Sequence, residues 1–255
     1  MSDWKFTKIE ERGPVAVVRF DRGEALNAFN EPLVRELTDV AHSFYDRHDI
    51  HAVVLTGTTK AFSAGADLKE RYGGAGFAAQ RDRSQLGRRL CRAWEEMPQI
   101  TVAAIEGLAV GAGVALAISC DWRTMGRGAY LYVPEVKIGL TLQWQAIPRL
   151  ISLVGPARAK RIIVLCEKMP AEQAFDWGLV DALADDGQAV TEALKLAEAA
   201  AAMPPEIVTM SKQAVNATAN ALLHAASFMD SDVSLLVRDA EPARRAREAF
   251  AKGKK

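Results

Sequence analysis

The feature that most constrains the fold is an alternation of short apolar runs with helical patterns over the first 120 residues. Candidate strands lie in two runs within residues 4–20, at Ala52–Thr56 and at residues 101–105. Residues 31–47 carry apolar side chains at helical spacing. A helix that stops before Pro98 is expected over 79–96, and a short apolar helix over 114–119. A strand–helix–strand order of this kind predicts an α/β fold in which helices cover a mostly parallel sheet.

Beyond about residue 142 the sequence becomes helical in pattern and strand signals disappear. Helices are expected over 156–167, 171–177, 188–203, 205–218 and 221–239. We therefore expect two parts, a core over residues 1–195 and a C-terminal helical region over residues 196–255.

Composition and charge exclude several classes of protein. The 255 residues include 32 Lys and Arg and 32 Asp and Glu, and a net charge of zero argues against a nucleic-acid binder. The longest apolar stretch, 108–118, holds two glycines and is too short to span a bilayer. Three widely spaced cysteines fit reduced thiols, and the first residues lack an apolar signal core. We expect a cytoplasmic protein without a membrane or nucleic-acid partner.

Metal and dinucleotide sites are not expected either. None of the four histidines has a partner at the i, i+4 spacing of a zinc-binding helix. The glycines within residues 107–113 do not form the pattern of a dinucleotide-binding loop.

Two segments of small residues follow candidate strands and lead into helices. Residues 62–68 read F-S-A-G-A-D-L, and residues 107–113 read G-L-A-V-G-A-G. Backbone N–H groups at such turns attract negative charge, and two of them converging could hold a developing oxyanion. Tight packing of strand–helix turns is the alternative explanation for the small residues.

These segments resemble those of the crotonase superfamily, the enoyl-CoA hydratase/isomerase family. Residues 62–68 match its F-x-A-G-A-D-[IL] pattern, and residues 107–113 with Cys120 and Asp121 resemble its second loop. Residues 171–181 match its later A-x-x-G-L-V-D pattern. The resemblance extends from about Arg19 to Phe250.

The resemblance implies a fold, a substrate and a set of contacts. The fold is a spiral of ββα units, and the C-terminal helical region forms a trimer or a dimer of trimers. The substrate is an acyl-coenzyme A thioester, with no permanently bound cofactor and no metal. The backbone N–H groups of Ala66 and Ala112 form the oxyanion hole, although the family usually has Gly at the second position. Substrate and coenzyme contacts are implied for Ala25, Leu26, Ala64, Asp67, Leu68, Gly111, Trp144, Phe250 and Lys252.

The family's hydratases use two glutamates, and this chain retains one of the two positions. Ala115 stands at the first position, whereas Glu135 follows Pro134 at the second. A carboxylate among apolar residues can have a raised pKa, which suits a proton shuttle. The alternative for Glu135 is a surface carboxylate paired with Lys137.

A single glutamate beside an oxyanion hole favours a 1,3-proton shift, in which no water is added. The chain therefore resembles the family's enoyl-CoA isomerases. Trp144, where hydratases typically have a Gly-rich turn, predicts a tighter and drier pocket. The run from Cys120 to Arg123 is also similar to that of the isomerases.

Two other functions stay open. A hydratase, or another lyase or hydrolase on an unusual acyl-CoA, would need a second acid; the candidates are Glu70, Asp82, Glu95 and Glu96. A non-catalytic acyl-CoA-binding subunit would need none.

Some residues depart from the family's pattern or have a competing role. Glu24 stands where many members carry a cation near the coenzyme phosphates, and Arg22 is the nearest positive charge in that segment. The basic tail after residue 243 is a second possible source of phosphate contacts. Asp67 is expected chiefly to cap the backbone that follows it.

Overall fold

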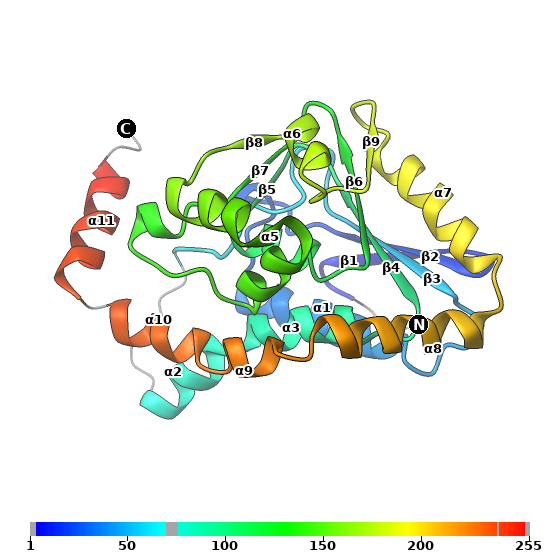
Figure 1. Ribbon diagram of the computed structural model, residues 1–255, viewed down its shortest axis with the longest axis horizontal. Coiled ribbons are helices and arrows are strands. Elements are labelled where there is room, and N and C mark those ends of the chain that lie inside the picture. The colour runs from blue at the N-terminus through cyan, green and yellow to red at the C-terminus, as the bar shows by residue number, and fades with distance from the viewer. Residues whose placement is uncertain (1–3, 70–75, 239, 253–255) are drawn as a thin grey trace.

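A six-stranded mixed sheet forms the centre of the computed structural model, which describes residues 4–69, 76–238 and 240–252 (Figure 1). Its strands in spatial order are β1 (Thr7–Arg12), β2 (Val15–Phe20), β3 (Ala52–Thr56), β4 (Ile100–Ile105), β6 (Trp122–Gly126) and β9 (Ala182–Ala184). β1 pairs with β2 antiparallel, and every later neighbour in the sheet is parallel. The expected α/β class is confirmed.

Helices bury both faces of the central strands. Every residue of β3 and β4 is buried, which explains why these strands appear in the sequence as unbroken apolar runs. α1 (Glu31–Ser43) and α3 (Leu86–Glu96) pack over one face, and α7 (Ala189–Ala201) packs over the other. α1 begins where expected, because the Asn30 side chain accepts a hydrogen bond from the Leu33 N–H.

A second, three-stranded sheet lies beside the first. It consists of β5 (Leu108–Val110), β7 (Tyr130–Tyr132) and β8 (Met169–Pro170). The expectation that strands end near residue 142 is wrong, since β8 and β9 follow. Strands of two and three residues are too short to show an alternating pattern.

The helix expected over 79–96 is two helices. α2 (Phe77–Ser84) has no buried residue, whereas α3 buries a full apolar face, and the two meet at Gln85. The helix expected over 221–239 is likewise divided, into α9 (Leu223–Ser227) and α10 (Asp230–Arg238). The first break falls where the chain passes from an exposed helix to a helix that is buried on one face.

The remaining helices complete the frame around the site. They are η1 (Ala25–Asn27), α4 (Ala112–Ala117), η2 (Val136–Ile138), α5 (Ala146–Leu165), α6 (Ala171–Asp176), α8 (Pro205–Ala219) and α11 (Glu241–Lys252). α5 begins ten residues earlier than expected and bends at Gly155, which precedes Pro156. α8 to α11 run along one edge of the molecule and turn around its end (Figure 1).

Across the described residues, no helix has the length and apolar character needed to span a bilayer. The three cysteines are free thiols. Burial raises the pKa of Cys91 to about 11 and that of Cys120 to about 12, so neither thiol ionises near neutral pH.

Candidate active site

The two segments of small residues lie against each other. The Val110 N–H donates to the Ser63 carbonyl at 2.9 Å, and the Phe62 N–H donates to the Leu108 carbonyl at the same distance. Gly65 has φ +88°, and a Cβ there would lie 2.6 Å from the Val110 carbonyl oxygen and 3.5 Å from the Ala112 nitrogen. Only glycine allows this approach, and it brings Ala66 and Ala112 to the same place.

Among the described residues, no backbone carbonyl accepts a hydrogen bond from the N–H of Ala66 or Ala112. Phe29 and Ala66 form an isolated parallel β-bridge. In it the Phe29 N–H donates to the Gly65 carbonyl, and the Asp67 N–H donates to the Phe29 carbonyl, so the Ala66 N–H takes no part. Ala112 is the first residue of α4, where an N–H group has no intrahelical acceptor. Two backbone donors are thus available beside Gly65, as an oxyanion hole requires.

Glu135 reaches this place from the end of β7. It directly precedes η2, and the Leu140 N–H donates to its carbonyl at 2.8 Å. A Cβ on Gly111 would collide with the Glu135 Oε1 atom, so the carboxyl group occupies the space that this glycine leaves open. Gly111 also has φ +51°, and it directly precedes the donor Ala112.

Burial gives Glu135 an unusual titration. Its Oε2 atom is buried and has no hydrogen-bond partner in the described part of the chain. The loss of solvent raises the pKa of Glu135 to about 7, against a small opposing effect of its own backbone. A pKa near neutrality lets one group both accept and return a proton, which suits a proton shuttle.

A cavity of about 680 Å³ extends from Ala66, Asp67 and Leu68 toward the C-terminal helices α10 and α11. Four of the residues implied by sequence line it: Ala66, Asp67, Leu68 and Trp144. Ala25 and Leu26 lie beside the same loop, since the Ala64 N–H donates to the Leu26 carbonyl at 2.9 Å. Phe250 and Lys252 lie in the last turns of α11, and the cavity is lined by Arg247 of the same helix.

Trp144 is held against α3 by two features that sequence reasoning missed. The first is Gly87, because a Cβ there would collide with the indole ring. Phe29 packs on the other side, with the two ring centroids 5.7 Å apart. A glycine on the buried face of an otherwise regular helix was the available signal in the sequence.

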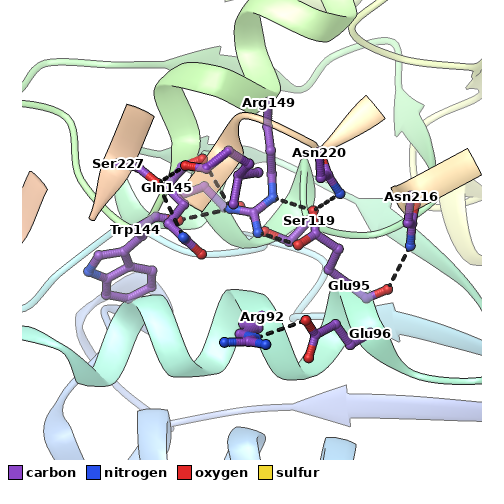
Figure 2. A network of polar contacts seen from close by, with 12 residues as sticks. Arg92, Glu95, Glu96, Ser119, Trp144, Gln145, Arg149, Asn216, Asn220 and Ser227 are labelled. Carbon is purple, nitrogen blue, oxygen red and sulfur yellow. Dashed lines mark hydrogen bonds and ion pairs between the residues drawn. The ribbon is translucent and has the colours of Figure 1, made fainter. Parts of the chain in front are cut away.

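The second feature is a buried polar network (Figure 2). Trp144 and Gln145 both have positive φ, and Arg149 Nη1 donates to both of their carbonyls at 3.1 Å. The same guanidinium binds Glu95 at 2.7 and 2.8 Å, and Figure 2 shows Asn216 and Asn220 closing the network around Glu95. Two residues in strained backbone are thereby fixed by a charged pair.

Asp67 has a structural role in this arrangement. Its Oδ1 accepts from the Lys69 N–H at 2.9 Å, and its Oδ2 pairs with Arg22 at 2.7 Å. Burial alone would raise the pKa of Asp67, but these two interactions outweigh it and keep the pKa below the ordinary value. Arg22 Nη1 also donates to the Ala28 carbonyl at 2.9 Å, so this guanidinium holds the backbone around Ala28 against the segment that carries Asp67.

The candidate second acids are engaged elsewhere. Glu95 binds Arg149, Glu96 binds Arg92, and Asp82 binds Arg89. Glu70 lies outside the described residues. Ala115 is buried in α4, so the first glutamate position of a hydratase is occupied by a methyl group. No group of three metal-ligating side chains occurs in the ranges described.

Known proteins are similar to this chain in sequence and in fold. The profile of the Enoyl-CoA hydratase/isomerase family matches residues 10–255. The short-chain-enoyl-CoA hydratase of Clostridium acetobutylicum is 34% identical over 209 residues, covering 82% of this chain and 80% of the relative. The crotonyl-CoA hydratase of Syntrophomonas wolfei is 31% identical, over the same shares.

A solved structure shows the same fold. The enoyl-CoA hydratase/isomerase from Pseudoalteromonas atlantica superposes with a TM-score of 0.87 over 98% of both chains, at 24% identity. Together with the family profile and the curated relatives, this similarity shows that the chain belongs to the enoyl-CoA hydratase/isomerase family of the crotonase superfamily.

Proposed function

We propose that the chain isomerises a 3-enoyl-CoA to the 2-enoyl-CoA with Glu135 as the single proton shuttle. The thioester oxygen accepts hydrogen bonds from the Ala66 and Ala112 N–H groups. The Glu135 carboxylate removes a proton from C2, and the electron pair moves into the thioester to give a dienolate. The protonated Glu135 then delivers that proton to C4, which leaves the double bond between C2 and C3.

The observation that carries this proposal is that one carboxylate oxygen of Glu135, Oε2, is buried and is bound by none of the described residues, while Oε1 lies against Gly111, next to the donor Ala112. The acids that line the cavity, Glu31 and Asp67, are both paired with arginine. A 1,3-proton shift needs one group that can both accept and return a proton. Glu135, with its pKa raised to about 7, can do both near neutral pH.

A hydratase is the second candidate function, because both curated relatives above are named hydratases. Hydration requires a second group to position and split water, and Ala115 cannot supply one. This candidate therefore depends on an acid from outside the family's usual position.

Product analysis distinguishes the two candidates. The protein is incubated separately with a medium-chain 3-enoyl-CoA and a 2-enoyl-CoA, and the products are analysed by mass. Isomerisation gives 2-enoyl-CoA at unchanged mass, whereas hydration adds one water to the 2-enoyl substrate. If neither substrate reacts but coenzyme A thioesters bind tightly, the protein is a non-catalytic acyl-CoA-binding subunit.

We also propose that the chain assembles as a homotrimer or a dimer of trimers, with coenzyme A entering only as part of the substrate. Large apolar side chains stand exposed on and after α8, at Ile207, Met210, Val215 and Leu222. Light scattering during gel filtration should give three or six times the chain mass of 27.7 kDa. A mass of 27.7 kDa would contradict this assembly.

A further inference from the structure

The wall of the cavity opposite the oxyanion loop carries a pair of polar groups that the proposed isomerisation does not use. Gln143 precedes α5, Ser234 lies on α10, and both line the cavity. The Gln143 Nε2 donates to the Ser234 Oγ at 2.7 Å, between segments 91 residues apart. Ser234 is 5% exposed.

Ser234 differs from other hydroxyl groups on the helices of this protein. Four of them donate to the carbonyl four residues earlier: Thr38, Ser152, Thr218 and Ser227. Ser234 does not, and within the described residues its hydroxyl hydrogen has no acceptor. A buried donor without an acceptor calls for an explanation, and a ligand in the adjoining cavity supplies one.

The helix that carries Ser234 is fixed over the cavity. Arg81 of α2 binds Asp232 at 2.9 and 3.0 Å, and the Gln145 N–H donates to Asp230 at 2.8 Å. Ser231 and Leu235 line the cavity on the same face of α10 as Ser234. Both contacts lie in the first turn of α10, so the end of the helix that carries Ser234 is held in place.

The pair offers one donor and one acceptor to the cavity. The Ser234 O–H can donate, and the Gln143 Oε1 accepts no hydrogen bond from the described residues. A hydroxyl group satisfies both at once, since it accepts and donates. A methyl group satisfies neither.

We propose that the acyl group of the substrate carries a hydroxyl beyond the reacting carbons, bound by Gln143 and Ser234. This inference rests on the proposed acyl-CoA function and names the class of its substrate. Leu140, which also lines the cavity, is hydrogen-bonded to the Glu135 backbone, and Ala66 lines the cavity as well, so a thioester held at Ala66 has this cavity beside it for its acyl chain.

Calorimetric titration of the full chain with non-reacting thioesters tests the proposal. The probes are saturated acyl-CoAs of four, six and eight carbons, each with a methyl, a hydroxyl or a carboxylate at the end of the chain. The hydroxyacyl-CoA should bind at least tenfold more tightly than the alkyl counterpart at one or more lengths. In Ser234→Ala this preference should fall below twofold, while the affinity for the alkyl thioester stays within twofold.

Ser152→Ala is the matched control, because Ser152 is exposed on α5 and donates to its own helix. It should keep the full preference. Equal or tighter binding of the alkyl series at every length would overturn the proposal, and so would a preference for the carboxylate. If Ser234→Ala lowers the affinity for all thioesters equally, the pair contacts the coenzyme part of the ligand, and the proposal is also overturned. If no thioester binds at all, the proposed acyl-CoA function fails as well.

Discussion

At the scale of the residue, the chemistry depends on how Glu135 titrates. Its carboxylate must be ionised to remove a proton, and burial raises its pKa to about 7. We therefore expect kcat/KM for 3-enoyl-CoA to rise with pH below about 7 and to level off above it. A profile that levels off near pH 4–5 would show that Glu135 titrates as a surface carboxyl group.

Glu135→Gln separates catalysis from stability. Activity should fall by about 10³-fold or more, because glutamine cannot shuttle a proton. Since the folded-state pKa is raised, ionisation of Glu135 destabilises the fold as pH rises from 4.5 toward 7. The variant lacks this penalty, so its stability relative to wild type should improve by about 2–3 kcal/mol between pH 5 and pH 8. Urea unfolding of both proteins at the two pH values measures this difference. A variant whose stability relative to wild type falls between pH 5 and pH 8 would contradict the account.

The identity of Glu135 could be predicted from sequence, but its environment could not. Its position follows from the Pro134–Glu135 step and the family pattern. Its burial depends on Gly111, which belongs to a different loop and which the pairing of β5 with β7 places beside Glu135. Gly87 and Arg149 escaped notice for the same reason, since each acts on Trp144 from another element.

At the scale of the element, the Arg149–Glu95 pair connects α5 to α3 and fixes the backbone around Trp144. Arg149→Met leaves a buried carboxylate without its partner and should lower the free energy of unfolding by about 3–5 kcal/mol. Adding Glu95→Gln removes that charge and should restore part of the loss. Denaturant unfolding of the two single variants and the double variant gives the coupling energy, and strictly additive losses would contradict a direct pair.

Gly87→Ala tests how the packing of Trp144 against α3 shapes the cavity. The added methyl group collides with the indole, so the ring must move, and kcat/KM should fall together with a change in the near-ultraviolet circular dichroism. Gly76→Ala is the matched control, because a Cβ at that position meets nothing within 4 Å. If both variants behave like wild type, Trp144 does not shape the cavity.

Elements with a continuous apolar pattern could be predicted, whereas those defined by their neighbours could not. β3 spans the residues expected, because a buried strand repeats one kind of side chain. The break at Gln85 and the short strands β8 and β9 depend on tertiary contacts that leave no local pattern.

At the scale of the whole molecule, the C-terminal helices complete the site that the sheets begin. A Cβ on Gly139 would lie 2.5 Å from the Ala243 carbonyl oxygen, so α11 packs directly on the segment that follows Glu135. Gly139 also has φ +70°. Gly139→Ala should therefore loosen α11, and limited proteolysis should remove this helix from the variant faster than from wild type. Equal cleavage rates would show that α11 does not depend on this contact.

The central claim is that one carboxyl group carries a proton from C2 to C4 without adding water. The most direct measurement uses a 3-enoyl-CoA deuterated at C2, with the position of the label in the product read by mass spectrometry. The account predicts 2-enoyl-CoA that carries deuterium at C4, because a buried Glu135 returns part of the label before solvent exchanges it. A hydrated product, or an isomerised product with no deuterium at C4, would contradict it.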